Sequence, residues 1–300
     1  MNILILGNSN LFQRKIYHSL KKKRNIKIEV ASKRKFKFKD NIIFYNSYKK
    51  AIDQTKSKIV YISLINSEHF KWAYYCLIKN KNVLIDKPFT INFKQTKKLI
   101  NLARKKKLFL SEAIVFQKHR QFKKVFSLLN MKKKIHLESN FHIPKLPRNN
   151  FRNRRDLGGG CFQDMSVYGA YLILLFFGKK KLKYENVNNN KFDQFSLLAK
   201  SKKILINCSF KFNSNYKNEI RIKNDSKLFI INYAFSPPID KSTEVRIFDD
   251  FKKKEYKLKF NKQNTFDDYF LQVIKLIKNK KYNYFYNEIE KIAKIKKQIS

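Results

Sequence analysis

Short apolar runs alternate with longer helical patterns over residues 1–120. The apolar runs are typical of buried strands, and the stretches between them repeat apolar side chains at the spacing of a helix face. Strands and helices in alternation predict a parallel sheet covered on both faces, hence a doubly wound, Rossmann-like domain over residues 1–120. The expected strands are residues 2–6, 26–31, 42–45, 58–64, 82–86 and 108–113, and the expected helices are 11–22, 69–79 and 91–105, with another beginning at 48.

The pattern changes over residues 117–134, where basic and polar residues dilute it and where we expect the domain boundary. An apolar run at 135–143 and a glycine-led apolar helix come next. Seven runs then follow without helices between them, and many alternate apolar and polar side chains with a period of two. This predicts a large open, mainly antiparallel sheet in a second, α+β domain over residues 121–300. The runs are LKYENV, FSLLAK, KILINCSFKF, NEIRIKN, KLFIINYAF, EVRIF and EYKLKF, and helical patterns at 266–277 and 284–299 close the chain.

The charge of the chain is extreme but evenly spread. Sixty-eight Lys and Arg against 22 Asp and Glu give a net charge of +46, which would ordinarily indicate nucleic acid or an anionic membrane. The lysines occur in every segment, however, and Lys, Asn, Ile, Phe and Tyr, whose codons are AT-rich, are all frequent. Codon bias therefore explains the charge, and we expect no specific nucleic acid or membrane partner, only nonspecific binding at low salt.

The cysteines and the apolar stretches of the chain indicate the cellular compartment. The three cysteines, Cys76, Cys161 and Cys208, have no ligand spacing, which predicts neither a disulfide framework nor a metal site and suits a reducing cytoplasm. The first apolar run, within residues 2–6, has no basic segment before it and is expected to be a strand rather than a signal peptide. The apolar stretch at 171–177 is too short to span a bilayer.

The first strand-to-helix turn is a candidate cofactor loop, because ligands of doubly wound sheets bind at the carboxyl ends of the strands. A dinucleotide fingerprint has glycine at three positions of this turn, and here only Gly7 is present, with Ser9 and Phe12 at the other two. Ser9 still permits close approach of a pyrophosphate, whereas Phe12 is too large for the packing that the third glycine allows. An ordinary tight turn remains the alternative. The candidate cofactor-binding residues of the loop are Gly7, Ser9, Asn10 and Leu11.

The end of the second strand bears on the choice of dinucleotide. An NAD site usually has an acidic residue there for the ribose hydroxyls, whereas this chain has Ser32, Lys33 and Arg34. A hydroxyl and two cations favour a 2′-phosphate, which predicts NADP(H) over NAD(H). The alternative is a chance basic pair in a lysine-rich chain.

Two segments carry a family resemblance. Residues 64–113 contain Asn66 and His69, then Asp86-Lys87-Pro88 at a strand end and Ser111-Glu112-Ala113 at the next. Residues 151–178 contain Gly158-Gly159-Gly160 followed by Asp164 and Tyr168, in a chain with only six glycines. Together they resemble the glucose-fructose oxidoreductase/inositol dehydrogenase (Gfo/Idh/MocA) family of NAD(P)-dependent oxidoreductases. The chain departs from the family pattern at Asp86 (usually Glu), Ile65 (usually Pro) and the thinned glycine loop.

The resemblance implies roles for the matching residues. Lys87, Asp164 and Tyr168 match its catalytic positions, and Asn66, His69, Asp86 and Lys87 its cofactor contacts. The residue types fit this chemistry, because a lysine ammonium stabilises alkoxide charge and lowers the pKa of a neighbouring tyrosine, so that either side chain could transfer the proton. Asp164 and Tyr168 share one helix face. The implied substrate contacts are Lys87, Arg152, Asp164 and Tyr168.

These observations predict a hydride-transferring oxidoreductase that acts on a hydroxyl or keto group of a sugar, polyol or nucleotide-linked sugar. The resemblance also implies association into a homo-dimer or homo-tetramer. Two alternatives stay open: a cofactor-binding scaffold or sensor without turnover, and a basic protein that binds polyanions. Each motif also has a purely structural interpretation: a helix-entry turn for the glycines, a core aromatic for Tyr168 and a packing residue for His69.

Overall fold

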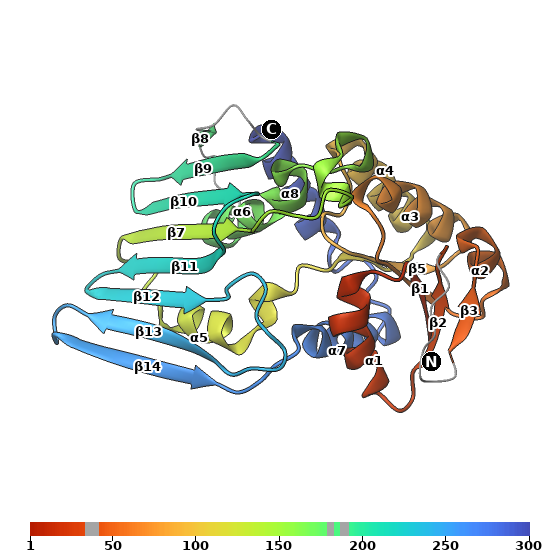
Figure 1. The fold of residues 1–300 in the computed structure, drawn as a ribbon, viewed down its shortest axis with the longest axis horizontal. Coiled ribbons are helices and arrows are strands. Elements are labelled where there is room, and N and C mark those ends of the chain that lie inside the picture. Colours follow the sequence, from red (N-terminus) through yellow and green to blue (C-terminus); the bar gives the residue numbers. More distant parts are fainter. Residues whose placement is uncertain (34–41, 179–182, 187–191) are drawn as a thin grey trace. The chain divides into compact units, whose positions relative to one another are not determined.

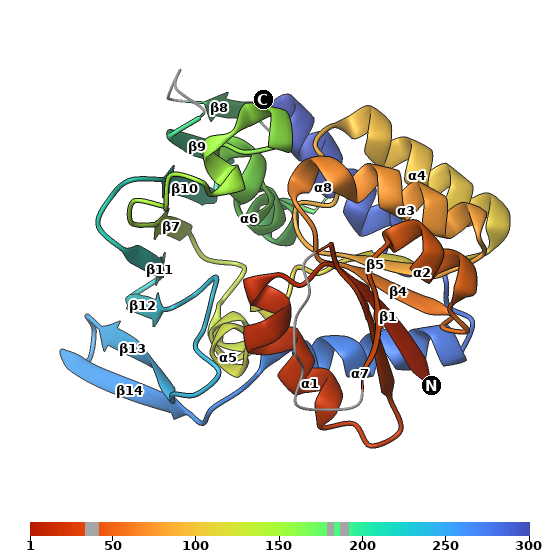
Figure 2. The ribbon, with the colours of Figure 1, turned by 45° about the vertical axis from the view of Figure 1, so that its right-hand side comes forward.

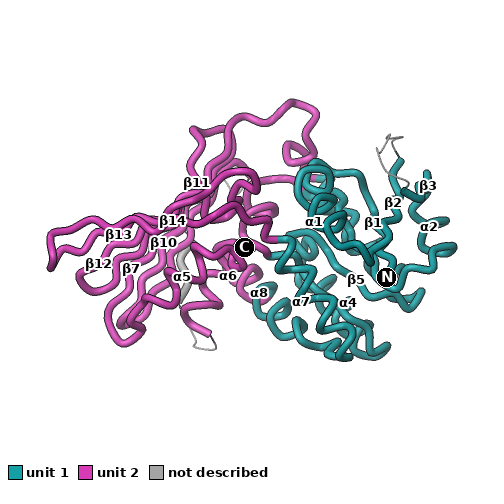
Figure 3. The backbone as a smooth tube through the Cα atoms, turned by 90° about the horizontal axis from the view of Figure 1, so that it is seen from below, with its two compact units in different colours: residues 1–114, 156–158, 266–293 teal, residues 115–155, 159–265, 294–300 magenta. Residues whose placement is uncertain are grey.

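The computed structural model describes residues 1–33, 42–178, 183–186 and 192–300, with only the backbone described for 183–186. The chain forms two compact units (Figure 3). Unit 1 comprises residues 1–114, 156–158 and 266–293, and unit 2 comprises 115–155, 159–265 and 294–300. The sequence predicted a division into residues 1–120 and 121–300. The two units differ from this division because unit 1 also contains residues 156–158 and 266–293.

Unit 1 is built on a six-stranded parallel sheet in the order β3-β2-β1-β4-β5-β6. The central strands β1 and β4 are buried and apolar except for Asn2 at the start of β1, as the sequence pattern predicts for a sheet covered on both faces. The strands are β1 (Asn2–Leu6), β2 (Lys27–Ala31), β3 (Ile43–Tyr45), β4 (Ile59–Ile62), β5 (Asn82–Ile85) and β6 (Leu110–Glu112). The order reverses between β1 and β4, which makes the carboxyl ends of these two strands the switch point of the sheet.

The helices of unit 1 cover both faces of this sheet. Helices α3 and α4 lie side by side over one face, and α1 and α7 lie over the other (Figures 1 and 2). Side chains that accept backbone N–H groups begin two of them, Ser47 before α2 and Asn92 before α4. The helices are η1 (Phe12–Ile16), α1 (Tyr17–Lys21), α2 (Tyr48–Gln54), η2 (Asn66–Glu68), α3 (His69–Ile78), α4 (Phe93–Lys106), α7 (Thr265–Lys278) and the larger, first part of α8 (Tyr286–Gln298), whose residues from 294 onward belong to unit 2.

Helix α7 explains why unit 1 includes a late segment of the chain. Tyr269 bonds with Ser111 of β6 through their hydroxyls at 2.7 Å, and both are buried. The rings of Phe266 and Phe270 pack against Tyr61 of β4. These contacts join residues about 150 to 200 positions apart, which local sequence pattern cannot detect.

Unit 2 is built on an eight-stranded sheet in the order β14-β13-β12-β11-β7-β10-β9-β8 (Figure 1). Strands β7 and β10 run parallel, and the other neighbours are antiparallel. All seven runs expected as strands in this half are strands. The bounds are β7 (Ile135–His142), β8 (Lys183–Asn186), β9 (Gln194–Lys200), β10 (Ile204–Lys211), β11 (Lys217–Asn224), β12 (Lys227–Asn232), β13 (Thr243–Asp249) and β14 (Lys254–Phe260).

Two helices, α5 (Arg120–Leu128) and α6 (Cys161–Phe177), pack on one face of this sheet. Helix α6 is the expected glycine-led helix and is buried along most of its length. Helix α5 lies where the sequence predicted only a diluted boundary. Its apolar face, with Phe122 and Val125, faces the sheet, while Arg120 and Lys123 face solvent. Three short helical turns follow: η3 (Phe116–Lys118), η4 (Phe151–Asn153) and η5 (Arg155–Leu157). The last of them leads into Gly158, the first glycine of the triplet, which belongs to unit 1.

Across the described residues, no helix combines the length and the apolar character needed to cross a membrane.

Candidate functional site

The loop after β1 is a backbone cradle at the switch point of the unit 1 sheet. Gly7 has φ +99°, and a Cβ at this position would lie 2.2 Å from the carbonyl oxygen of Ser63. Only glycine therefore permits this approach of β1 to the chain after β4. The amides of Ser9, Asn10 and Leu11 find no acceptor among the described residues. The loop thus presents three backbone donors of the kind that bind a pyrophosphate.

The carboxylate of Asp86 follows β5 and is buried. Tyr61 donates its hydroxyl to Oδ1, and Ser63 donates to Oδ2 at 2.5 Å. Burial raises the pKa of Tyr61 well above its ordinary value, and the Asp86 charge raises it further, so this phenol stays protonated and remains a donor. Tyr61 and Ser63 are two positions apart in and after β4 and point to the same side.

The segment that carries Lys87 is held by its flanking backbone. His69 lies 2.7 Å from the carbonyl oxygen of Pro88 through Nδ1, and Glu112 accepts the amide of Phe89 at 2.7 Å. The other ring nitrogen, Nε2, lies 3.1 Å from the carbonyl oxygen of Leu64, so the ring lies between two backbone carbonyl groups. His69 is 0% exposed. Hydrogen bonds thus hold three of the residues 86–89, namely Asp86, Pro88 and Phe89. The partly buried Lys87 lies between them in the chain.

Asn66 and Gly158 join the start of the glycine triplet to unit 1. Asn66 donates its amide to the carbonyl oxygen of Gly158 at 2.8 Å. Gly158 has φ +75°, and a Cβ there would lie 2.8 Å from the Cβ of Asn66 and 3.0 Å from the amide nitrogen of Ser67. The first glycine of the triplet is therefore required by close packing, and Asn66 is engaged in that packing.

The end of β2 carries the residues expected to choose between the dinucleotides. Ser32 is buried and donates its amide to Tyr45 of β3, whereas Lys33 is exposed. The pKa of Tyr48 is raised by burial, against an opposing effect of its hydrogen bond with the Lys33 backbone. Arg34 lies outside the described residues.

The other two glycines of the triplet shape unit 2. A Cβ on Gly159 would lie 2.5 to 2.6 Å from three carbonyl oxygens of residues 151–154, and Gly160, with φ +100°, packs against Phe192. This tight turn starts α6 and presents Asp164, which is 3% exposed. Arg152 donates Nε to Oδ2 of Asp164 at 3.0 Å. Two of the expected substrate contacts are thus an ion pair with each other.

Tyr168 lies one turn after Asp164, within a cluster of aromatic rings. Its ring centroid is 5.7 Å from Phe116, 5.4 Å from Phe141 and 4.9 Å from Phe235. The ring is 8% exposed. The cluster fixes the direction of the Tyr168 side chain, as a residue with a defined chemical role requires.

The structure brings together the unit 1 residues expected from sequence at one edge of the sheet, the carboxyl ends of β1, β4 and β5. Ser32 and Lys33 follow β2 at the same edge. Within unit 2 it brings together Arg152, Asp164 and Tyr168. Sequence reasoning missed Tyr61, Ser63 and the anchoring role of Glu112. The Tyr61 and Ser63 hydroxyls sit in an apolar run, where they resemble core residues, and only the strand alternation that places both on one side could have indicated a shared partner.

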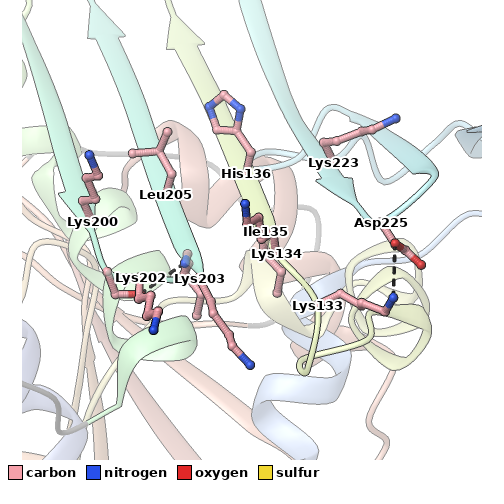
Figure 4. A pocket seen from close by; sticks show the side chains of 12 residues that line it. Lys133, Lys134, Ile135, His136, Lys200, Lys202, Lys203, Leu205, Lys223 and Asp225 are labelled. Atoms are coloured by element: carbon pink, nitrogen blue, oxygen red, sulfur yellow. Dashed lines mark hydrogen bonds and ion pairs between the residues drawn. The ribbon is translucent and has the colours of Figure 1, made fainter.

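Unit 2 also holds a basic hollow of about 620 Å³ (Figure 4). Six lysines line it, at the start of β7, in the β9–β10 turn and at the end of β11; we call them the lysine pocket: Lys133, Lys134, Lys200, Lys202, Lys203 and Lys223. Lys133 is 3.7 Å from Asp225, and Lys223 pairs with Asp250. Lys134, Lys200 and Lys202 have no carboxylate partner among the described residues. Phosphate compounds are expected to collect here by charge alone, so any nucleotide-binding measurement has to control for this pocket.

Comparison with known proteins finds a match to the same family over residues 1–114. Residues 1–114 match the GFO/IDH/MocA model, described as the oxidoreductase family with an NAD-binding Rossmann fold. A dTDP-3,4-didehydro-2,6-dideoxy-alpha-D-glucose 3-reductase of Saccharopolyspora spinosa is 26% identical over 212 residues, which cover 67% of this chain and 63% of that enzyme. A trans-1,2-dihydrobenzene-1,2-diol dehydrogenase of Xenopus tropicalis is 29% identical over 46% of this chain and 42% of its own length. The matches thus span less than two thirds of these relatives.

Among solved structures, a 3-ketoreductase from Actinomadura kijaniata in complex with NADP and TDP-benzene superposes with a TM-score of 0.87. It is 20% identical, and the match covers 98% of this chain and 95% of that one. At this identity the likeness establishes the fold. The predicted fold class, a doubly wound parallel sheet and a second domain with a large, mainly antiparallel sheet, is confirmed.

Proposed function

Because residues 1–114 match the model of the GFO/IDH/MocA family of NAD-binding oxidoreductases, we propose that the chain is a member of this family and transfers a hydride between a nicotinamide dinucleotide and a keto or hydroxyl group of a nucleotide-linked sugar. The observation that carries the proposal is the unit 1 edge, where a backbone cradle and a fixed lysine occur at the carboxyl ends of β1 and β5, the two strands that flank β4. The names of the relatives support the substrate class, since one is a reductase of a dTDP-linked keto sugar.

The residues at this edge fit a dinucleotide. The amides of Ser9, Asn10 and Leu11 would bind the pyrophosphate, and Gly7 keeps the strand end close enough for them to converge. Ser32 and Lys33 would meet the adenosine ribose. When bound, the cofactor supplies the hydride. His69, with no exposed surface, would act by fixing the Pro88 carbonyl rather than by contact.

The chain's own chemistry concerns the proton. When a hydride adds to a carbonyl carbon, the π bond breaks and negative charge develops on the oxygen, which must then accept a proton. We assign Lys87 to stabilise this charge, and either Lys87 or Tyr168 to donate the proton. Arg152 and Asp164 would orient substrate oxygens, because a paired arginine and carboxylate offer both donors and an acceptor.

The proposed compartment is a reducing one. Cys76, Cys161 and Cys208 are all buried, and none of them forms a disulfide within the described residues. Burial raises the pKa of the Cys208 thiol to about 12. Such thiols are inert packing residues.

The function is tested by NADPH binding, measured by nicotinamide fluorescence at rising salt concentration. The variant Asn10→Glu places a carboxylate beside the loop amides and is expected to weaken binding about tenfold or more, since like charges would meet. The matched control Asn207→Glu makes the same change at an exposed position of β10 and should bind as wild type does.

A second control tests whether the affinity for NADPH comes from the lysine pocket. The triple variant Lys134→Gln/Lys200→Gln/Lys202→Gln should retain NADPH binding that persists in salt, with tripolyphosphate as a poor competitor. If binding instead fades with salt equally in wild type and Asn10→Glu, or disappears in the triple variant, the polyanion-binding alternative replaces the oxidoreductase.

We further propose a preference for NADP(H) over NAD(H), carried by Lys33 at the end of β2. Lys33→Glu is expected to weaken NADPH binding about tenfold while leaving NADH binding within about twofold, because only NADPH has a 2′-phosphate for the ammonium to meet. The ratio of the two dissociation constants reports the effect directly. An equal change for both dinucleotides would show that Lys33 does not select the phosphate.

A further inference from the structure

Ser63 lies between the two parts of the unit 1 edge because of the strand order. Strand β4 is flanked by β1 and β5. The amide of Ser63 donates to Leu6 of β1 at 2.8 Å, and the amide of Asp86 donates to Ile62 of β4 at 3.0 Å. The residue that follows β4 therefore faces the cofactor loop on one side and the Lys87 segment on the other.

The side chains at this position form a continuous chain of hydrogen bonds. The amide of Phe12 donates to Ser9 Oγ at 3.0 Å, Ser9 Oγ and Ser63 Oγ are 2.6 Å apart, and Ser63 Oγ is 2.5 Å from Asp86 Oδ2. We call this the serine chain. It connects the backbone of the first helical turn after the loop to the residue immediately before Lys87.

Proton counting fixes the direction of the serine chain. An ionised carboxylate only accepts, and a serine hydroxyl has one proton to donate. Ser63 therefore gives its proton to Asp86 and must accept from Ser9. Ser9 in turn accepts from the Phe12 amide. The direction of the Ser9–Ser63 hydrogen bond is therefore set by the bond from Ser63 to Asp86. The bond to the Asp86 carboxylate has a charged acceptor, which makes it one of the stronger kinds of hydrogen bond.

The surroundings make this arrangement sensitive to the loss of one member. Ser63 is 2% exposed and Asp86 8%, and the protonated Tyr61 occupies the other carboxylate oxygen. With Ser63 removed, the Ser9 hydroxyl would lose its acceptor and Asp86 Oδ2 this donor, and water has little access to replace the donor at the buried Asp86.

We propose that Ser63 is a positioning residue that couples the conformation of the cofactor loop to the placement of Lys87, an inference that rests on the function proposed above. Ser9 lies in the loop whose amides bind the pyrophosphate, and Asp86 is joined to Lys87 by one peptide bond. A single hydroxyl therefore acts on cofactor affinity through Ser9 and on turnover through Asp86.

The test is a double-mutant cycle with Ser9→Ala and Ser63→Ala, read out by the NADPH dissociation constant and by kcat. Ser63→Ala is expected to raise the dissociation constant about tenfold and to lower kcat at saturating NADPH by a similar factor, whereas Ser9→Ala raises the dissociation constant alone. The double variant should bind NADPH about as weakly as either single one, because both substitutions break the same link.

The matched control is Ser19→Ala, which removes another buried serine hydroxyl of unit 1, one without a hydrogen-bond partner among the described residues. It should leave both quantities unchanged. Two results overturn the inference alone: wild-type-like NADPH binding by Ser63→Ala, or a double variant weakened by the product of the single effects, roughly 100-fold. A wild-type protein that binds no dinucleotide overturns the proposed function, and the coupling with it.

Discussion

Replacing Lys87 with methionine is expected to lower kcat about 1,000-fold and to leave the NADPH dissociation constant within about threefold of wild type. Methionine keeps much of the length and volume of the lysine side chain but removes the ammonium group, so the developing oxyanion would lose the positive charge and the proton source that we propose for it. The backbone anchors at Asp86, Pro88 and Phe89 do not involve the ammonium group, and the segment should keep its conformation.

The measurement needs a keto-sugar nucleotide for which the wild type shows NADPH oxidation. The control is Lys97→Met, the same substitution at an exposed position of α4, which should retain full activity. Tyr168→Phe in parallel identifies the proton donor: if Lys87 donates the proton, the tyrosine variant keeps far more activity than the lysine variant. A Lys87→Met enzyme within threefold of wild-type kcat would favour the scaffold alternative.

Local pattern was enough to predict most of the fold. The buried strands of unit 1 are apolar runs bounded by helical patterns, and the strands of unit 2 alternate with a period of two, because one face of that sheet is covered by α5 and α6. Helix α5 was missed although Phe122, Val125 and Phe126 recur at helical spacing, because the basic residues around them were interpreted as a domain boundary. The return of α7 to unit 1 depends on contacts such as Tyr269 with Ser111, which no window of the sequence contains.

The sequence indicates candidate chemistry-bearing residues more readily than it indicates the residues that hold them. Gly7, Lys87 and Asp164 stand out because their types are unusual in their surroundings or match a motif. Ser63 and Tyr61 lie within an apolar run and have no local signal. Their importance arises only when strand order brings β4 beside β5 and places both hydroxyls on Asp86. A sequence specifies such partners through topology, so they become visible only once the sheet is assembled.

Gly7→Ala is expected to destabilise unit 1 severely, by about 4 kcal/mol or more. Two costs combine. The backbone at Gly7 has φ +99°, which side-chain-bearing residues rarely adopt, and the new Cβ would lie 2.2 Å from the Ser63 carbonyl oxygen and 2.7 Å from a methyl group of Leu64. The carbonyl belongs to the backbone that follows β4 and cannot move aside without disturbing the pairing of β1 with β4.

Gly178→Ala separates these two costs. Gly178 also has a positive φ, +60°, but a Cβ there meets no atom of the described residues within 4 Å. This variant should lose only the conformational part, roughly 1–3 kcal/mol. Urea unfolding of both variants gives the comparison, with NADPH binding as a second readout, since relief of the overlap would move the loop amides away from the pyrophosphate. Equal losses of stability in the two variants would mean that backbone conformation alone requires glycine at position 7. The greater loss expected for Gly7→Ala would show that the close approach of β1 to the chain after β4 also excludes a side chain at this position.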